Sequence, residues 1–312
     1  MWEFFSTFLA QLLNRRDDCS VPHEGATDPD NDDSTPDGSD TDWQIVTPVE
    51  TKLPTVGVWC GRSSLRNPER DVEFALKHNI NRFDIVVNDH SKWRTPKPFN
   101  TYNKDQIVRL AKIARAYDIE VHLMSWVMPD ANYLVGAKHQ LTHLMEETEA
   151  VSLQWDAEEP WTQGRGDLTH AQAAKLIGEL FSATSMGVNG IGYASKSKLG
   201  PFADVCEYIV PQAYATRTSG LDPSTAPSQF YRRWSNAFKK PVVMGLAAYR
   251  QSGIVPGFSE EKAIRTAARQ ALLIKEVDTL IYWSLYHIRK NPKVATEIAK
   301  LRTTSSSTQA TV

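Results

Sequence analysis

Cysteine is scarce in this sequence, which has only Cys19, Cys60 and Cys206 among its 312 residues. The number is odd, the three positions are far apart, and none has the short spacing of a metal-binding pair. The sequence therefore predicts neither a disulfide framework nor a zinc site. Cys60 and Cys206 lie in apolar surroundings and are expected to be buried thiols, which favours a reducing compartment.

Hydrophobic runs long enough to cross a membrane are also missing. In residues 1–16 the apolar side chains fall on one face of a short helix, and its nine apolar residues are too few to span a bilayer. No basic residue precedes this stretch and no small-residue cleavage site follows it, so we expect cytoplasmic synthesis without a secretory signal. Residues 1–16 are either a docking helix for a protein partner or a membrane surface, or a helix that folds onto the rest of the chain.

Basic residues are absent between Asp17 and Asp42, where ten acidic residues occur. Residues 17–51 are rich in Asp, Pro, Ser, Thr and Gly and show no periodicity, so they are predicted to be a disordered acidic linker. Outside Asp17–Asp42 the chain carries 35 basic and 27 acidic residues. A basic body can attract an anionic polymer such as a bacterial wall, although ordinary solubilising charge explains the surplus equally well. No nucleic-acid partner is predicted, and the Ser/Thr-rich residues 303–312 are expected to form a flexible tail.

Residues 52–302 repeat one pattern, a short β-rich run followed by a loop and an amphipathic helical stretch. Eight such units fit an α/β fold of the (βα)8 TIM-barrel class better than an open doubly wound sheet. No glycine-rich fingerprint for a dinucleotide or phosphate follows the first run, which further disfavours the open sheet. A helical stretch over 169–186 is expected before the fifth strand. The predicted strands are Thr55–Trp59, Arg82–Val87, Glu120–Val127, Val151–Asp156, Gly190–Ala194, Tyr208–Tyr214, Val242–Tyr249 and Thr279–Leu285.

The fourth of these runs ends in two closely spaced carboxylates. The segment Val151–Trp161 reads V-S-L-Q-W-D-A-E-E-P-W, with Asp156 and Glu158 two residues apart. Side chains alternate along a strand, so both carboxylates are expected to project from the same side. Two like charges at close range resist simultaneous ionisation, so one carboxyl keeps its proton and can act as an acid while its partner stays anionic. Glycosidases use this division of labour, although a solvated strand end or an ion pair with Arg would give the same pattern.

The other strand ends contribute aromatic and amide side chains. In a TIM barrel the active site lies at the C-terminal ends of the strands, so these side chains are expected to form a ring. Aromatic rings stack on the C–H faces of sugars, while acids and amides bind the sugar hydroxyls. The ring therefore predicts a carbohydrate site. Tyr214 is grouped with Asp156 and Glu158 as a candidate catalytic residue, and the predicted substrate-binding members are Trp59, Trp126, Tyr193, Gln212, Tyr249 and Trp283.

Metal chemistry and cofactors are not predicted. His122 and His287 are assigned to the third and eighth strands, but no spaced cluster of carboxylates accompanies them. Both are therefore interpreted as core or rim residues. Asp84 lies in the middle of the second strand, where a buried hydrogen-bonding role and a catalytic role are equally open.

Three short motifs resemble those of the family 18 chitinases. They are the D-x-E of Asp156 and Glu158, the Q-x-Y of Gln212 and Tyr214, and the I-Y-W-S of Ile281–Ser284. The D-x-E also resembles that of the family 25 muramidases, which include phage lysins and bacterial lysozymes. The resemblance covers the predicted barrel.

The family 18 resemblance implies a role for each matching residue. Glu158 would be the general acid, and Asp156 would orient the substrate's acetamido group and stabilise the oxazolinium formed when that group attacks. Tyr214 would hydrogen-bond near the same acetamido group. Trp283 would form the floor of a sugar subsite.

The chain also departs from both families. The full family 18 signature is D-x-x-D-x-D-x-E, and Val151 and Gln154 stand in place of its two earlier aspartates. Family 25 enzymes usually place an aspartate at the end of the first strand, where this chain has Val58 and Trp59. These departures keep open a catalytically silent barrel that binds glycan or forms part of a larger assembly.

The leading expectation is a glycoside hydrolase that acts on an N-acetylhexosamine polymer, with bacterial peptidoglycan preferred over chitin. The basic body and the missing signal favour a phage-encoded or particle-associated lysin acting on the cell wall. A chitinase-like enzyme is an alternative. A further alternative is a barrel glycosidase of other specificity that uses Asp156 or Glu159 with a carboxylate on another strand. Glu159 ranks below Glu158 because it points away from Glu158 if the strand continues.

Overall fold

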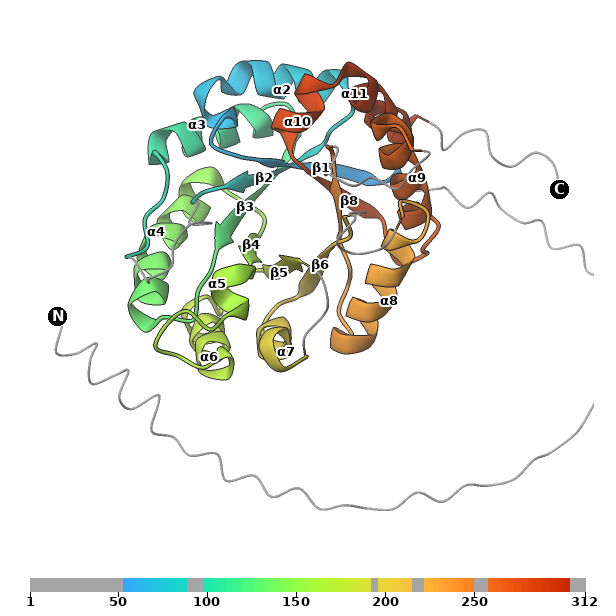
Figure 1. Cartoon of the computed structure of the whole chain (residues 1–312). Helices are drawn as coiled ribbons and strands as arrows, with labels where there is room; N and C mark the ends of the chain where they lie inside the picture. The colour runs from blue at the N-terminus through green and yellow to red at the C-terminus, as the bar shows by residue number, and fades with distance from the viewer. Residues whose placement is uncertain (1–52, 89–97, 192–195, 215–221, 250–257, 304–312) are drawn as a thin grey trace, which may run out of the picture. The chain divides into compact units, whose positions relative to one another are not determined.

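Eight parallel strands close into a barrel in chain order, with helices around its outside (Figure 1). The computed structural model describes residues 53–88, 98–191, 196–214, 222–249 and 258–303. The TIM-barrel fold expected from the sequence is confirmed. The strands are β1 (Thr55–Cys60), β2 (Arg82–Val86), β3 (Glu120–Trp126), β4 (Leu153–Asp156), β5 (Met186–Ile191), β6 (Tyr208–Gln212), β7 (Met244–Ala247) and β8 (Thr279–Trp283).

Several helices begin at a side chain that bonds the free N–H groups of the first turn. Asn103 accepts from the N–H of Gln106, and Thr169 and Gln172 form a reciprocal capping box. The helices are α2 (Pro68–Lys77), α3 (Lys104–Arg115), α4 (Ala131–Thr148), α5 (Glu159–Thr162), α6 (His170–Leu180), α7 (Lys196–Asp204), α8 (Ala226–Phe238), α9 (Glu260–Leu272), α10 (Leu285–Lys290) and α11 (Pro292–Ala299), with short 3-10 turns η1 (Ser64–Arg66) and η2 (Lys300–Arg302).

Most of the apolar core lies between the strands and the surrounding helices. All five residues of β2 are buried, because helices cover the outer face of the sheet while the inner face turns toward the other strands. Cys60 and Cys206 are buried free thiols, as predicted. A second, smaller apolar cluster comes from five different strands and consists of Trp59, Val86, Met124, Val210 and Ile281.

Strand β5 begins four residues earlier than predicted. The helical stretch expected over 169–186 ends at Leu180, and the strand covers Met186–Ile191 instead of Gly190–Ala194. Two glycines and an asparagine give this segment little intrinsic strand preference, so pairing with β4 and β6 decides its conformation. The neighbouring strand β4 is shorter than predicted, because Val151 is exposed and lies outside it.

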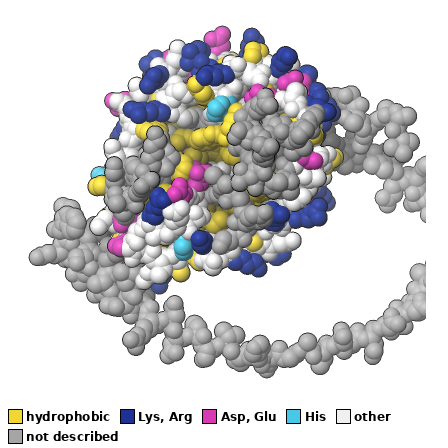
Figure 2. Space-filling model, in the orientation of Figure 1, with side chains coloured by type: hydrophobic (Ala, Val, Ile, Leu, Met, Phe, Trp, Pro, Cys, Tyr) yellow, Lys and Arg dark blue, Asp and Glu magenta, His cyan; other side chains and the backbone are white. Residues whose placement is uncertain are grey.

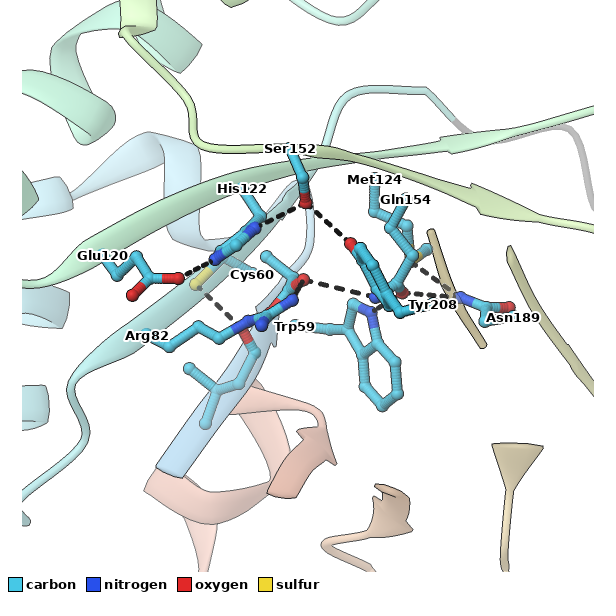
Figure 3. A network of polar contacts seen from close by, with 12 residues as sticks. Trp59, Cys60, Arg82, Glu120, His122, Met124, Ser152, Gln154, Asn189 and Tyr208 are labelled. Atoms are coloured by element: carbon cyan, nitrogen blue, oxygen red, sulfur yellow. Dashed lines mark hydrogen bonds and ion pairs between the residues drawn. The ribbon is translucent and has the colours of Figure 1, made fainter. Parts of the chain in front are cut away.

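Polar side chains lie at the N-terminal end of the barrel and hydrogen-bond to one another. His122 hydrogen-bonds through Nδ1 to Ser152 Oγ at 2.7 Å and through Nε2 to Glu120 at 2.5 Å (Figure 3). Ser152 Oγ also lies 2.7 Å from Tyr208 OH. Ser152 and His122 are both buried, so the serine hydroxyl is not open to a substrate. The prediction that His122 is a core residue is confirmed.

His287 was assigned to the eighth strand, and this is wrong. β8 ends at Trp283, and His287 lies in α10, the helix that follows it directly. The run of apolar residues after Trp283 belongs to that helix, where Leu285 and Ile288 are buried. His287 is therefore a residue of the barrel rim.

Residues 1–16 and 17–51, the predicted docking segment and acidic linker, lie outside the described residues, as does nearly all of 303–312. Among the helices of the described ranges, none combines the length and the apolar character needed to cross a membrane.

A glycine in β5 makes room for one of the polar side chains at the N-terminal end of the barrel. A Cβ at Gly187 would overlap the ring of Tyr208, whereas one at Gly200 would meet nothing within 4 Å. Gly187→Ala is expected to lower the free energy of unfolding by about 1–3 kcal/mol, because the half-buried ring of Tyr208 must move. Gly200→Ala, in α7, is the control and is expected to be neutral or stabilising. Urea unfolding measures both, and equal stability of the two variants would contradict this packing argument.

Candidate active site

Asp156 and Glu158 lie together at the C-terminal end of β4. Asp156 is the last residue of the strand, is only 2% exposed, and is paired in register with Trp126 on β3 and Asn189 on β5. Glu158 lies beyond the end of β4 and, with a φ of −85° and a ψ of −139°, is the N-cap residue that precedes α5. The two carboxyl groups nevertheless interact, and the interaction raises the pKa of Asp156.

Burial is the main influence on both carboxyl groups. It raises the pKa of Asp156 well above its ordinary value, and the neighbouring Glu158 raises it further. Burial also raises the pKa of Glu158, to about 7. A hydrogen bond from Gln212 lowers this pKa, and the charge of Glu159 raises it by a smaller amount. The pair therefore holds protons at a pH where exposed carboxyl groups are ionised. Because the two groups are coupled, the protons belong to the pair.

The Q-x-Y motif at the end of β6 lies beside these carboxyl groups. Gln212 Nε2 donates to Glu158 Oε1 at 2.9 Å. Burial raises the pKa of the Tyr214 phenol well above its usual range, and Glu158, Tyr249 and Asp156 raise it further. The fold thus brings together residues from β4, β6 and the end of β7, which the sequence predicted as one site.

Two acceptor atoms in this group lack a protein partner. Asp156 Oδ1 and Gln212 Oε1 are both buried, and neither receives a hydrogen bond from a described residue. Leaving a buried acceptor unpaired costs free energy. A ligand with N–H or O–H donors would supply what these atoms lack.

Aromatic side chains from the first and last strands lie against one another. The rings of Trp59 and Trp283 have centroids 5.8 Å apart at an interplanar angle of 57°. Trp59 is only 1% exposed and donates its indole N–H to Gln154, so it supports Trp283 from within the barrel. Trp283 is half-buried and is the more accessible of the two.

The remaining predicted residues occupy different settings. Tyr249 stacks on His287, with ring centroids 4.5 Å apart and nearly parallel planes. Trp126 ends β3 and is 9% exposed. Tyr193 was placed at the end of the fifth strand and lies outside the described residues, beyond the observed end of β5. Glu159 begins α5 and pairs with Arg165 at 2.5 Å, and this setting agrees with its lower rank as a candidate acid.

Two residues that contribute to the site were not among the predicted ones. Asn189 on β5 and Gln154 on β4 are both fully buried and hydrogen-bond to each other at 2.8 Å. The signal in the sequence that could have indicated them is an amide side chain inside an otherwise apolar strand. Gln154 was noticed only as a departure from the family 18 signature, and the misplaced fifth strand hid Asn189.

The face of the barrel shown in Figure 2 is hollowed at its middle. Apolar side chains line the hollow and acidic side chains lie next to them. Among the described residues, no group of three or more His, Cys, Asp or Glu side chains could hold a metal ion. The side chains named above supply carboxyl, amide and aromatic groups to the site.

No family model matches the chain, and no curated protein matches it. Solved structures do. The GH18 chitinase ChiB from the chitin utilization locus of Flavobacterium johnsoniae is 11% identical, with 81% of this chain and 95% of that one covered and a TM-score of 0.55. A mutant GH18 chitinase from Cycas revoluta, in complex with (GlcNAc)4, is 10% identical over 80% of this chain and 99% of its own, with a TM-score of 0.55.

A xylanase-alpha-amylase inhibitor protein, XAIP-I, solved in complex with trehalose, has the same fold. It is 15% identical, with 78% of this chain and 97% of that chain covered and a TM-score of 0.55. These likenesses show that the chain has the TIM-barrel fold of these proteins, which include family 18 chitinases. The resemblance to family 25 muramidases stays a prediction.

The raised pKa of Glu158 makes stability depend on pH. In the unfolded chain Glu158 loses its proton near its usual pKa of 4.5, and in the folded protein near 7. The folded state therefore binds the extra proton of Glu158 between these values, so the contribution of Glu158 to stability falls as pH rises from about 4.5 to 7. Glu158→Gln is expected to be more stable than the wild type at pH 8, by up to about 3 kcal/mol, and similar to it at pH 4.

Urea unfolding at the two pH values measures this difference. Glu159→Gln is the control, because that side chain is exposed and ion-paired with Arg165. The expectation fails if the stability of both variants relative to the wild type changes equally with pH.

Proposed function

We propose that the barrel is a glycoside hydrolase that cleaves an N-acetylhexosamine polymer, with Glu158 as the general acid. The observation that carries this proposal is the raised pKa of Glu158, about 7, at the C-terminal end of the barrel beside Asp156. A carboxyl group with this pKa keeps a proton to donate near neutral pH and is acidic enough to donate it. Protonation of the glycosidic oxygen by Glu158 accompanies breakage of the bond between that oxygen and the sugar C1.

The proposed second group is the substrate's own acetamido. Its carbonyl oxygen attacks C1 as the glycosidic bond breaks, which gives an oxazolinium. Asp156 Oδ1 is buried and receives no hydrogen bond from a described residue, which supports a role in receiving the acetamido N–H. Water then adds at C1 and gives its proton to Glu158, which restores the acid.

Tyr214 and Trp283 are proposed to hold the sugar. Tyr214 is close enough to both carboxyl groups for their charges to raise its pKa, which supports a hydrogen bond near the acetamido group. The half-buried Trp283 rests on Trp59 and offers an aromatic surface for stacking on a sugar ring. Trp126, Tyr249 and Gln212 complete the proposed substrate contacts.

Peptidoglycan and chitin both contain N-acetylhexosamine, and the site chemistry suits either. The surplus of basic residues in the barrel favours the anionic wall polymer. The (GlcNAc)4 bound to a chitinase with the same fold supports chitin. We therefore propose that the site recognises N-acetylhexosamine. Peptidoglycan is the polymer that the sequence favours, and an enzyme that cleaves it would act at a cell wall.

A glycan-binding barrel without activity is the second candidate. Gln154 carries no charge or exchangeable acidic proton, although it occupies a position where the family 18 signature has an aspartate. The inhibitor protein with the same fold, solved with trehalose, supports such a role.

Release of soluble reducing sugar from purified peptidoglycan and from chitin tests the proposal. Glu158→Gln is expected to lower the rate by about a hundredfold or more, because the substituted amide cannot donate the proton. Wild-type activity is expected to decline above about pH 7, as Glu158 loses its proton. Glu159→Gln is the matched control and is expected to keep the rate near neutral pH, with the decline only slightly displaced toward lower pH because the charge of Glu159 makes a smaller contribution to the pKa of Glu158.

The substrates and the outcomes separate the candidates. Activity on chitin alone would keep the mechanism and replace the preferred polymer. Binding of (GlcNAc)4 by calorimetry without hydrolysis of either polymer would overturn the hydrolase and support the binding barrel. Equal rates for the wild type and Glu158→Gln would remove Glu158 from the acid role.

A further inference from the structure

A continuous hydrogen-bonded path crosses the barrel interior and begins near its N-terminal end. The Arg82 guanidinium donates to both oxygens of the Asp84 carboxylate, each at 2.9 Å, and both residues are buried. Gln154 Nε2 donates to Asp84 Oδ1 at 3.3 Å. Because β3 lies between β2 and β4, this bond spans the interior instead of following the sheet. Figure 3 shows Arg82, Gln154 and Asn189 along the path.

The path continues through two more amides to Glu158. Asn189 Nδ2 donates to Gln154 Oε1 at 2.8 Å. Gln212 Nε2 donates to Asn189 Oδ1 at 3.1 Å and to Glu158 Oε1 at 2.9 Å. We call Gln154, Asn189 and Gln212 the amide relay. None of the three is more than 5% exposed, so their amides depend on protein partners.

The direction of the relay is set at its first amide by two groups that have only one possible role. The Asp84 carboxylate can only accept, and the Trp59 indole can only donate. Asp84 therefore accepts a hydrogen bond from the NH2 of Gln154. Trp59 Nε1 donates to the oxygen of Gln154 at 2.8 Å. The same oxygen accepts the NH2 of Asn189, whose own oxygen is then left for the NH2 of Gln212.

Building on the proposed function, we infer that the relay positions the acid. The Arg82–Asp84 pair, acting through the amide relay, holds the NH2 of Gln212 against one oxygen of Glu158. That oxygen accepts a hydrogen bond and does not carry the proton. The proton of the acid form is therefore on the other oxygen, where a leaving group can receive it. A reversed Gln212 would present its own oxygen and accept that proton instead.

The charges around Glu158 are separate from the relay. The titratable groups that face it in the described part of the chain are Asp156 on β4, Glu159 at the start of α5 and Tyr214 after β6. None of them hydrogen-bonds to a relay amide in the described contacts. Breaking the relay at a distance therefore changes the hydrogen bond to Glu158 and leaves these groups in place.

Gln154→Met tests the relay from a position that does not touch Glu158. The thioether has a similar length but cannot orient Asn189, so Gln212 becomes free to turn. We expect the acid dissociation constant of Glu158 to fall by about tenfold, because the N–H that favours its charged form is lost for part of the time. In the hydrolysis assay, kcat is expected to fall more than KM changes.

Carbon-13 NMR titration of the side-chain carboxyl follows Glu158, and the spectrum of Glu158→Gln identifies its resonance. Ser152→Ala is the matched control, since it lies two residues earlier, is buried, and loses hydrogen bonds outside the relay. It is expected to leave the titration of Glu158 unchanged. If Gln154→Met does not fold, Asn189→Ala breaks the relay at the next amide.

A folded relay variant whose Glu158 titrates as in the wild type would overturn the inference, as would an equal shift in Ser152→Ala. The NMR titration does not require turnover. A shifted Glu158 in a protein without hydrolytic activity would therefore support the relay and count against the proposed function. An unshifted Glu158 in an active enzyme would do the reverse.

Discussion

The buried ion pair between Arg82 and Asp84 is the interaction on which the polar interior of the barrel depends. An unpaired charge in this position would be costly, and the two hydrogen bonds of the guanidinium satisfy the carboxylate in a fixed geometry. Since the carboxylate can only accept, each amide bonded after it has a defined orientation. An apolar interior of the same volume would fill the space equally well and would leave Gln212 free to turn. The polar groups therefore contribute orientation more than stability.

Burial governs the other end of the barrel in a different way. It withholds water from Asp156 and Glu158 and so raises the pKa of both carboxyl groups. At Glu158 the N–H of Gln212 works against burial, and the balance leaves a pKa of about 7. The same packing buries Asp156 Oδ1 and Gln212 Oε1, and neither receives a hydrogen bond from the described part of the chain. The raised pKa values and the burial of these two acceptors thus have one physical cause, which is the close packing around the carboxyl pair.

Much of the candidate site could be predicted from local patterns. Asp156 and Glu158 close one strand, and Gln212 and Tyr214 close another, so a parallel barrel has to bring these ends to the same side. The predicted strand end at Asp156 is confirmed, but the turn of the chain into α5 directly after β4, with Glu158 as the N-cap residue, was not foreseen. Asn189 was missed because Met186–Ile191 has weak strand propensity and becomes a strand through pairing. Trp59 was predicted to bind substrate because tryptophan often stacks on sugars. It is almost completely buried and packs against Trp283.

The sequence by itself determined the repeating strand and helix pattern, the barrel class, and the strands that carry the carboxyl, amide and aromatic groups. These features follow from side-chain periodicity and from residue types, which act over a few neighbouring positions. Only the tertiary structure decided the bounds of β5, the protonation of the carboxyl pair and the direction of the amide relay. Each of these depends on contacts between strands that are far apart in the chain. Burial sets the protonation of the carboxyl pair. Asp84, which can only accept, and Trp59, which can only donate, set the orientation of the amides.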